Sequence, residues 1–379
     1  MRNSRRSAVD PFIVMDVMEA ARRAEAQGRH IIHMEVGQPG TPAPAGARAA
    51  VAAAMEEDAL GYTVALGLPA LRARIARLYG EWYDVDLDPG RVIVTAGSSG
   101  AFLLSFTALF DTGDQVGIGA PGYPSYRQIL RALDLQPVMI ETAAENRLQP
   151  VPGDLPGDLA GLMVASPANP SGTMLDREAL GALIGAAQDQ GAAFISDEIY
   201  HGVEYERKAV SALQISDDVY VINSFSKYFS MTGWRVGWMV VPEDHVRVVE
   251  RIAQNMFICP PHVSQVAALA AMECPEELQG NLAVYAENRR LMLQGLPAAG
   301  FRNIAPPDGA FYVYADVSDL TDDSRAFAAE LLAGAGVSVT PGLDFDAARG
   351  AHTLRFSYAR STADIREGLR RLAEFMAAR

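Results

Sequence analysis

The sequence predicts an α/β protein in which a mostly parallel sheet is sandwiched by helices and is accompanied by a smaller α+β domain. Three observations predict this class. From residue 91 onward, short β-branched segments alternate with longer helical ones, which is typical of parallel strands joined by crossover helices. The segment 236–241 is apolar throughout, as expected for a strand buried on both faces of a sheet. The length of 379 residues suits two or three domains of ~150 residues each.

The N-terminal part of the chain predicts two helices separated by a linker. Asp10 is the expected N-cap and Pro11 the first residue of a helix whose periodicity continues over 12–26 and stops at Gly28. The segment 37–44 is rich in glycine and proline and is the clearest linker of the chain. Pro69 then begins another helix. We expect residues 1–44 to pack with the small domain.

Residues 45–285 are expected to form the large domain and residues 286–379 the small one. The strands predicted for the large domain are 91–95, 115–119, 136–141, 162–166, 193–197, 219–224 and 236–241, with helices at 98–110, 124–133 and 176–190. The small domain is predicted to contain strands 311–315, 337–340 and 353–357 and helices 324–335 and 363–378. In open α/β sheets, ligands bind beyond the carboxyl ends of the strands, so a functional site is expected there.

Composition narrows the classes of partner. Lysine plus arginine number 32 and aspartate plus glutamate 46, so the net charge is −14, and an acidic chain repels the phosphate backbone of nucleic acids. No run of 18 apolar residues is present, and the two cysteines, Cys259 and Cys274, cannot form a disulfide framework. The six histidines show no metal-ligand spacing. We therefore expect a cytoplasmic protein with no metal, no membrane partner and no nucleic-acid partner.

Three strand ends carry polar groups. The turn 95–100 (Thr-Ala-Gly-Ser-Ser-Gly) opens a helix, whose free N–H groups favour an anion such as phosphate, although Ser98 could simply cap that helix. Asn169 lies between two prolines, where it could also close an Asx-turn. Asp197 ends an apolar strand, where a carboxylate is costly unless it meets a cation or hydrogen-bond donors; it too could be the N-cap of a helix.

A lysine and two arginines complete this set. Lys227 lies among hydroxyl and aromatic side chains at a strand end, where partial burial lowers the pKa of an amine and makes it a nucleophile; a solvated surface lysine is the alternative. Arg355 lies within a strand, where a guanidinium needs a carboxylate from the protein or from a ligand. With Arg235 as a second cation, these groups are the parts that a pyridoxal-phosphate site requires.

The order of these motifs resembles that of the class I/II aminotransferases of the aspartate aminotransferase superfamily (fold type I). The motifs are Asn169-Pro-Ser-Gly172, Asp197-Glu-Ile-Tyr200 and Ser224-Phe-Ser-Lys227, with Arg235 eight residues further on. The resemblance extends over residues 37–356. It implies a fold type I large domain with a smaller domain, pyridoxal 5'-phosphate as cofactor, and a homodimer with shared active sites. It also implies transfer of an amino group from an α-amino acid to a 2-oxo acid through a Schiff base on Lys227.

The resemblance implies a role for each matching residue. Lys227 is the Schiff-base lysine and the base that shuttles the proton, and Asp197 pairs with the pyridine nitrogen. Tyr200 and Asn169 hydrogen-bond the ring phenolate oxygen. Arg355 binds the substrate α-carboxylate, helped by Asn169 and the backbone near Gly37. The remaining residues implied to hold the cofactor are Tyr123 on the ring face, Ser98, Ser99, Ser224, Ser226 and Arg235 at the phosphate, and Tyr62 at the phosphate of the neighbouring subunit.

The amino donor is predicted to be a neutral, aliphatic or aromatic amino acid. Relatives that recognise a second carboxylate place a cation at one of two positions, which by alignment are Ser99 or Gly100 and Gln254 in this chain. The segments 13–14 and 256–258 and Tyr312 are apolar or aromatic and are expected near the substrate side chain. 2-Oxoglutarate is the expected acceptor. Asp346 follows a phenylalanine after which relatives often have glycine, which predicts only a different loop end.

Two other functions stay open at this point. A carbon–sulfur β-lyase on the same scaffold would share every cofactor residue, and release of pyruvate without a 2-oxo-acid acceptor would distinguish it. A non-catalytic pyridoxal-phosphate sensor would be fused to a DNA-binding module. The acidic charge and the short segment before residue 37 argue against such a module.

Overall fold

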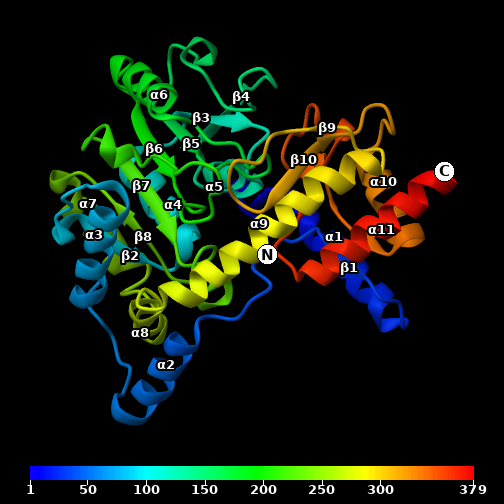
Figure 1. Cartoon of the computed structure of the whole chain (residues 1–379). Coiled ribbons are helices and arrows are strands. Elements are labelled where there is room, and N and C mark those ends of the chain that lie inside the picture. The colour runs from blue at the N-terminus through cyan, green and yellow to red at the C-terminus, as the bar shows by residue number, and fades with distance from the viewer.

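The computed structural model describes all 379 residues and is organised around a seven-stranded sheet (Figure 1). The strands follow the order β2-β8-β7-β6-β5-β3-β4. Their bounds are β2 Val92–Thr95, β3 Gln115–Ala120, β4 Gln136–Glu141, β5 Gly161–Ala165, β6 Ala193–Asp197, β7 Tyr220–Ser224 and β8 Gly237–Val240. β8 is antiparallel to β2 and β7 because the connection 225–236 carries no α-helix that could cross the sheet. All other pairs are parallel, which confirms the predicted fold class.

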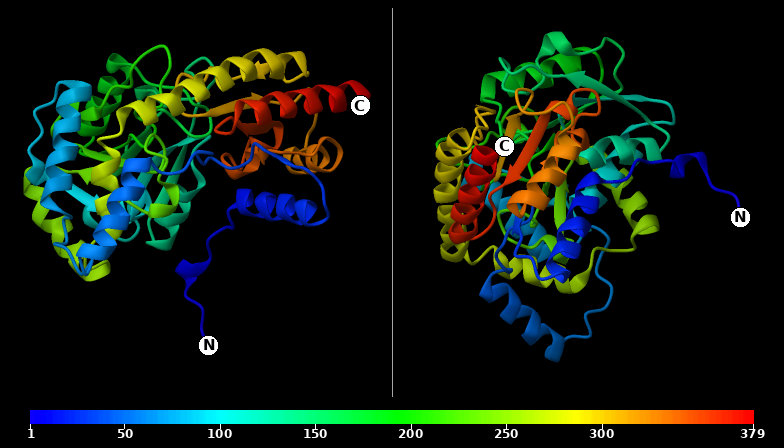
Figure 2. Two further views of the ribbon diagram at one scale, coloured as in Figure 1. Left: turned by 60° about the horizontal axis from the view of Figure 1, so that its bottom comes forward. Right: turned by 90° about the vertical axis from the view of Figure 1, so that its right-hand side faces the viewer.

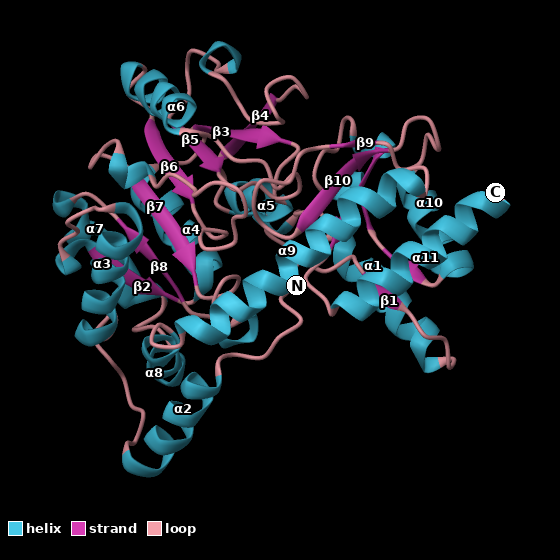
Figure 3. Ribbon diagram, in the orientation of Figure 1, coloured by secondary structure: helices cyan, strands magenta, loops and turns pink.

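Helices cover both faces of this sheet (Figure 3). They are α3 Pro69–Tyr83, α4 Gly97–Leu109, α5 Pro124–Ala132, α6 Arg177–Asp189, α7 Val246–Met256 and α8 His262–Ala271. Alternate residues of a strand point to opposite faces. In β2, Val92 and Val94 therefore join a core cluster with α3 and α6, whereas Ile93 joins another with α4, α5 and α7. Burial on both faces explains why these strands are apolar throughout.

A second, antiparallel sheet lies in the C-terminal part of the chain. Its strands follow the order β12-β13-β10-β9, with bounds β9 Asn303–Ile304, β10 Tyr312–Asp316, β12 Thr340–Pro341 and β13 Thr353–Ser357. The helices α9 Pro275–Ala298, α10 Ser324–Glu330 and α11 Thr362–Ala378 accompany it, and a π-helical turn over Leu331–Ala335 follows α10. α9 continues unbroken through the predicted domain boundary at residue 285 (Figure 2). The division into domains stays a prediction.

The N-terminal segment lies against this C-terminal part. β1 (Ile32–His33) pairs in parallel with β11 (Val337–Ser338), so the predicted strand 337–340 is divided between two sheets. α1 spans Ile13–Ala26. The prediction that Asp10 caps this helix was wrong, because the Asp10 carboxylate instead binds Gln128 and Arg131.

α2 (Ala45–Glu57) was not predicted, and it projects from the body of the molecule (Figure 1). Only Ala47 of its residues is buried, so the segment lacks the apolar stripe by which helices are recognised in a sequence. None of the helices combines the length and the apolar character that crossing a membrane requires.

Gly237 allows β8 to approach the start of α4, and we predict that alanine there is destabilising. A Cβ atom at this position would lie 2.8 Å from the Asn223 carbonyl oxygen and 3.1 Å from the Ser98 nitrogen. Relieving these contacts should cost about 1–3 kcal/mol of the free energy of unfolding, measured with urea. Gly185→Ala, in α6 with nothing near the new methyl group, is the control and should stabilise by about 0.5–1 kcal/mol. Equal effects of the two changes would contradict this interpretation.

Candidate active site

A chamber of about 210 Å³ lies at the carboxyl ends of the parallel strands. Three neighbouring strands place residues in its lining: Asn169 follows β5, Asp197 ends β6 and Lys227 follows β7. β13 contributes Arg355 from the C-terminal part of the chain. The other predicted site residues that line the chamber are Gly37, Ser98, Ser99, Tyr123, Tyr200, Ser226 and Arg235. Residues scattered from 37 to 355 in the sequence thus share one cavity.

The Lys227 amine lies inside this chamber. Its Nζ donates a hydrogen bond to the Gly37 carbonyl oxygen at 2.5 Å and lies 5.5 Å from the ring centroid of Tyr200. Burial and the nearby guanidinium groups of Arg355 and Arg235 lower the pKa of Lys227 to about 7, although Asp197 acts in the opposite direction. The amine therefore has a large neutral fraction near pH 7, as a nucleophile or proton acceptor requires.

Asp197 is a buried carboxylate with 2% of its surface exposed. It accepts hydrogen bonds from the Tyr126 hydroxyl and, at 3.0 Å, from the Ile199 backbone N–H. Burial raises the pKa of Asp197 to about 6, although these two donors and Lys227 favour the charged form. Tyr126 was missed in the sequence. Its place three residues after Tyr123, the N-cap of α5, is the signal that could have found it.

The start of α4 forms a cradle of hydrogen-bond donors. Its N-cap is Ala96, which offers no side-chain acceptor, so the interpretation of Ser98 as a cap is wrong. Arg235 lies directly against Gly97, where a Cβ atom would clash with its guanidinium, and Arg235 Nη1 donates to the Thr232 carbonyl oxygen at 3.0 Å. Free N–H groups at a helix start, together with a guanidinium, form a typical site for a phosphate.

The two serines before Lys227 differ in whether they line the chamber. Ser226 lines the chamber, whereas Ser224 lies behind it. The Ser224 hydroxyl is 2.9 Å from the Ser226 hydroxyl and donates to the Val236 carbonyl oxygen at 3.1 Å. From this position Ser224 can orient Ser226, and it does not itself face the cavity.

Arg355 is held in the wall of the chamber by hydrogen bonds and by two aromatic rings. Nη1 donates to Asn169 Oδ1 at 2.8 Å and Nη2 to the Glu35 carbonyl oxygen at 2.5 Å. The rings of Tyr312 and Phe345 lie 4.4 and 4.7 Å from its Cζ. The buried Nε has no hydrogen-bond partner. Since Arg355 lines the chamber, its guanidinium is the cation that a substrate carboxylate would meet there.

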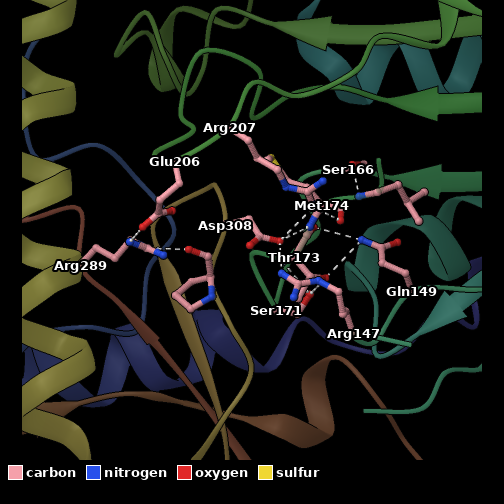
Figure 4. Close-up of polar contacts among 12 residues, drawn as sticks. Arg147, Gln149, Ser166, Ser171, Thr173, Met174, Glu206, Arg207, Arg289 and Asp308 are labelled. Atoms are coloured by element: carbon pink, nitrogen blue, oxygen red, sulfur yellow. Dashed lines mark hydrogen bonds and ion pairs between the residues drawn. The ribbon is translucent and has the colours of Figure 1, made fainter. Parts of the chain in front are cut away.

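The loop that carries Asn169 is braced from both sides. Gln149 Nε2 donates to the Thr173 carbonyl oxygen at 3.1 Å, and the Ser171 and Thr173 hydroxyls are 2.8 Å apart. On the other side, the Asp308 carboxylate accepts the Met174 N–H at 3.0 Å and is paired with arginines. Figure 4 shows these contacts around Asp308 and the nearby ion pair of Glu206 with Arg289. This bracing fixes the position of Asn169 relative to Arg355.

Some predicted residues lie elsewhere. Tyr62 is 83% exposed and does not reach the chamber of its own chain. Ile13 and the segment 256–258 do not line it either. Met256, the last residue of α7, and Ile258 are exposed. Val14 and Tyr312 line the chamber as expected, and the Tyr312 hydroxyl is 2.7 Å from that of Tyr200. The apolar wall formed by Phe12, Met15, Met18 and Val36 was not predicted.

These groups fit the cofactor that the sequence resemblance implies. A phosphate needs the donors around α4 and Arg235, and an aldehyde needs an amine with a large neutral fraction near pH 7, which Lys227 has. A protonated pyridine nitrogen is a suitable partner for the buried Asp197 carboxylate. The chamber therefore has the donor set for pyridoxal phosphate.

Comparisons with known proteins agree with this site. The model of the family described as aminotransferase class I and II matches residues 29–372. The valine–pyruvate aminotransferase of Mycobacterium tuberculosis is 46% identical over 378 residues, which cover 98% of this chain and 97% of that protein. A crystal structure from Silicibacter pomeroyi, provisionally assigned as an aminotransferase, is 76% identical, with a TM-score of 0.96 over the whole of both chains. Thermus thermophilus aspartate aminotransferase with maleate is 31% identical, with a TM-score of 0.92 over 99% of this chain and 100% of that one.

We predict that Lys227 titrates near pH 7. The chain contains two lysines, Lys208 and Lys227, so reductive methylation with ¹³C-formaldehyde after removal of any cofactor labels these two amines and the N-terminal amine. The Lys227 signal should shift with a midpoint near pH 7, because below it the amine is protonated and above it neutral. Lys208, whose side chain is 83% exposed, is the internal reference. Lys208→Arg and Lys227→Ala assign the two lysine signals, which leaves the third signal to the N-terminus. A Lys227 midpoint near 10.5, the ordinary value, would show that the chamber does not perturb the amine.

Proposed function

The chain belongs to the class I and II aminotransferases, pyridoxal-phosphate-dependent enzymes that move the amino group of an α-amino acid to a 2-oxo acid, and we propose that its donor is a neutral aliphatic amino acid and its acceptor pyruvate. The observation that carries this proposal is the apolar wall of the chamber. The wall comprises Val14, Met15 and Met18 of α1 with Val36 and Phe12. A charged substrate side chain against this wall would lose its hydration without gaining a partner.

Each cation that lines the chamber already has another role in the proposed site. Arg235 lies at the phosphate cradle, Lys227 is the reactive amine, and Arg355 is the group for the α-carboxylate. No further lysine or arginine lines the cavity. This argues against a second carboxylate on the donor, and by the same reasoning against 2-oxoglutarate, which the sequence had favoured as acceptor. The name of the Mycobacterium tuberculosis relative, a valine–pyruvate aminotransferase, supports the same pair of substrates here.

The proposed roles of the chain's residues follow from their positions. Arg355, which lines the chamber, binds the substrate α-carboxylate and so fixes which bond at Cα is exposed to the amine. Lys227 then takes the proton from the substrate Cα and gives it back as the amino group is transferred. Asp197 stabilises positive charge at the buried end of β6. When bound, pyridoxal phosphate supplies a ring that accepts the electron pair of the broken Cα–H bond.

We further propose that two copies of the chain form a homodimer. Tyr62 and Val64 are exposed, as are Met256 and Ile258. His262, at the start of α8, donates a hydrogen bond from Nδ1 to the Gly61 carbonyl oxygen at 3.0 Å and so links the segments that carry these side chains. Large exposed apolar side chains on linked segments are typical of an interface, and a second copy would cover them. Sedimentation of the purified protein at the mass of one chain would contradict the dimer. The cytoplasmic location stays a prediction.

We predict that neutral donors react at least about 100-fold faster than aspartate. The donor half-reaction of the holoenzyme, followed by the change in cofactor absorbance, gives kcat/KM for valine, leucine, alanine and aspartate separately. The second half-reaction compares pyruvate with 2-oxoglutarate, and pyruvate should be preferred. Lys227→Ala is the control for contaminating activity and should show neither half-reaction.

Two outcomes would overturn this proposal. Aspartate as the fastest donor would show that a cation outside the chamber of one chain serves the second carboxylate. Ammonia and pyruvate released from cysteine or cystathionine without any 2-oxo acid, at a rate above that of transamination, would favour the β-lyase alternative.

A further inference from the structure

The wall of the chamber is held by a residue far away in the sequence. The N-cap of α1, Phe12, provides no side-chain hydrogen bond to the helix. The Asp344 carboxylate does so instead: Oδ1 accepts the Ile13 N–H at 3.0 Å and Oδ2 accepts the Val14 N–H at 3.1 Å. Asp344 is 1% exposed. Because Val14 itself lines the chamber, this cap lies directly behind the surface that faces the substrate.

The loop that carries Asp344 also contacts the carboxylate-binding arginine. The ring centroid of Phe345, the next residue, lies 4.7 Å from the Cζ atom of Arg355. Loop, wall and arginine therefore form one connected unit. A shift of the loop would move the wall relative to the position of the substrate α-carboxylate, and so change the space left for the side chain.

Backbone contacts fix the same loop to the segment that carries Tyr123. The Phe345 carbonyl oxygen accepts the Gly122 N–H at 3.0 Å, and the Asp344 carbonyl oxygen accepts a hydrogen bond from Arg127 Nη2 at 2.9 Å. The loop is thus attached at the cofactor side as well as at the substrate side.

Asp346 and Arg349 fix the end of this loop. The Asp346 carboxylate accepts the Ala348 N–H at 3.0 Å and Arg349 Nε at 2.8 Å. The guanidinium of Arg349 then donates to the carbonyl oxygens of Thr142 at 2.9 Å and Ala120 at 2.5 Å. The departure from glycine at Asp346 therefore has a structural reason, since its carboxylate orients the arginine that joins the loop to β3.

We propose that Asp344 is a positioning residue that sets the side-chain selectivity of the enzyme, by fixing the α1 wall at a defined distance from Arg355. This inference rests on the proposed function, a neutral amino donor. Discrimination between apolar side chains differing by one methylene reaches only ~10–200-fold. Such discrimination requires a rigid wall, because a wall that moves would accommodate both side chains. A helix whose first N–H groups lose their acceptor frays from that end, and in α1 this end is the wall.

Asp323 provides a matched control. Its carboxylate Oδ1 accepts the N–H groups of Arg325 and Ala326, both at 3.0 Å, and so caps α10 as Asp344 caps α1. α10 contributes no residue to the chamber. A general loss of stability after removal of a cap would therefore affect Asp323→Ala and Asp344→Ala alike, whereas a change of selectivity should be specific to Asp344.

The test uses holoenzyme of the parent, Asp344→Ala, Asp344→Asn and Asp323→Ala. Hydrogen exchange reports the opening of α1, and the donor half-reaction gives kcat/KM for valine and alanine. In Asp344→Ala, exchange at residues 13–18 should accelerate about tenfold and the valine-to-alanine ratio of kcat/KM should fall at least about fivefold. Asp344→Asn keeps the shape and one oxygen acceptor, so it should fold and show a smaller effect of the same kind. Asp323→Ala should accelerate exchange in α10 and leave the ratio unchanged.

Two results would overturn the role of Asp344. In one, α1 exchanges faster in the Asp344 variants while the valine-to-alanine ratio stays at the parent value. In the other, exchange in α1 does not change at all. Failure of the proposed function is a separate result, since it would show in the parent enzyme as a preference for aspartate over both neutral donors.

Discussion

One buried carboxylate sets the conditions for the rest of the site. Asp197 ends β6 with 2% of its surface exposed, and burial there disfavours the charged form of a carboxyl group. The Tyr126 hydroxyl, the Ile199 N–H and the Lys227 amine each favour that charged form. The carboxylate and the amine come from adjacent parallel strands, so the sheet itself places opposite charges in one cavity. The protein's own groups compensate the negative charge of Asp197 only in part. A cationic ligand would compensate the remainder best.

The second constraint is that no single part of the chain closes the chamber. The parallel sheet supplies the amine, the carboxylate and the anion cradle, whereas the group for a substrate carboxylate, Arg355, comes from an antiparallel strand of the C-terminal part. The apolar wall comes from α1, at the opposite end of the sequence. Long-range contacts, such as that of Lys227 with Gly37 and of Arg355 with Asn169, join these parts. Chemistry and selectivity thus reside in different segments.

The residues that could be predicted from the sequence are those whose position follows from a strand end. Asn169, Asp197 and Lys227 follow or end apolar segments that only a buried sheet explains, and their shared chamber is the consequence of parallel strands. The residues that were missed depend on tertiary contacts. The cap of α1 comes from Asp344, 330 residues from Val14, so local pattern assigned it wrongly to Asp10. The role of Tyr126 depends on its hydrogen bond to Asp197, 71 residues away in the sequence, although its place near Tyr123 marked it as a candidate. α2 has almost no buried face and so leaves no apolar pattern.

The most direct test of this account is the protonation state of the pyridine nitrogen in the holoenzyme, measured by ¹⁵N NMR with labelled pyridoxal phosphate. If Asp197 compensates a cation at this position, the nitrogen should remain protonated between about pH 6 and pH 9, and Asp197→Ala should lose that proton within the same range. A neutral nitrogen in the parent enzyme, or one whose protonation is the same in Asp197→Ala, would contradict the pairing on which the site is built.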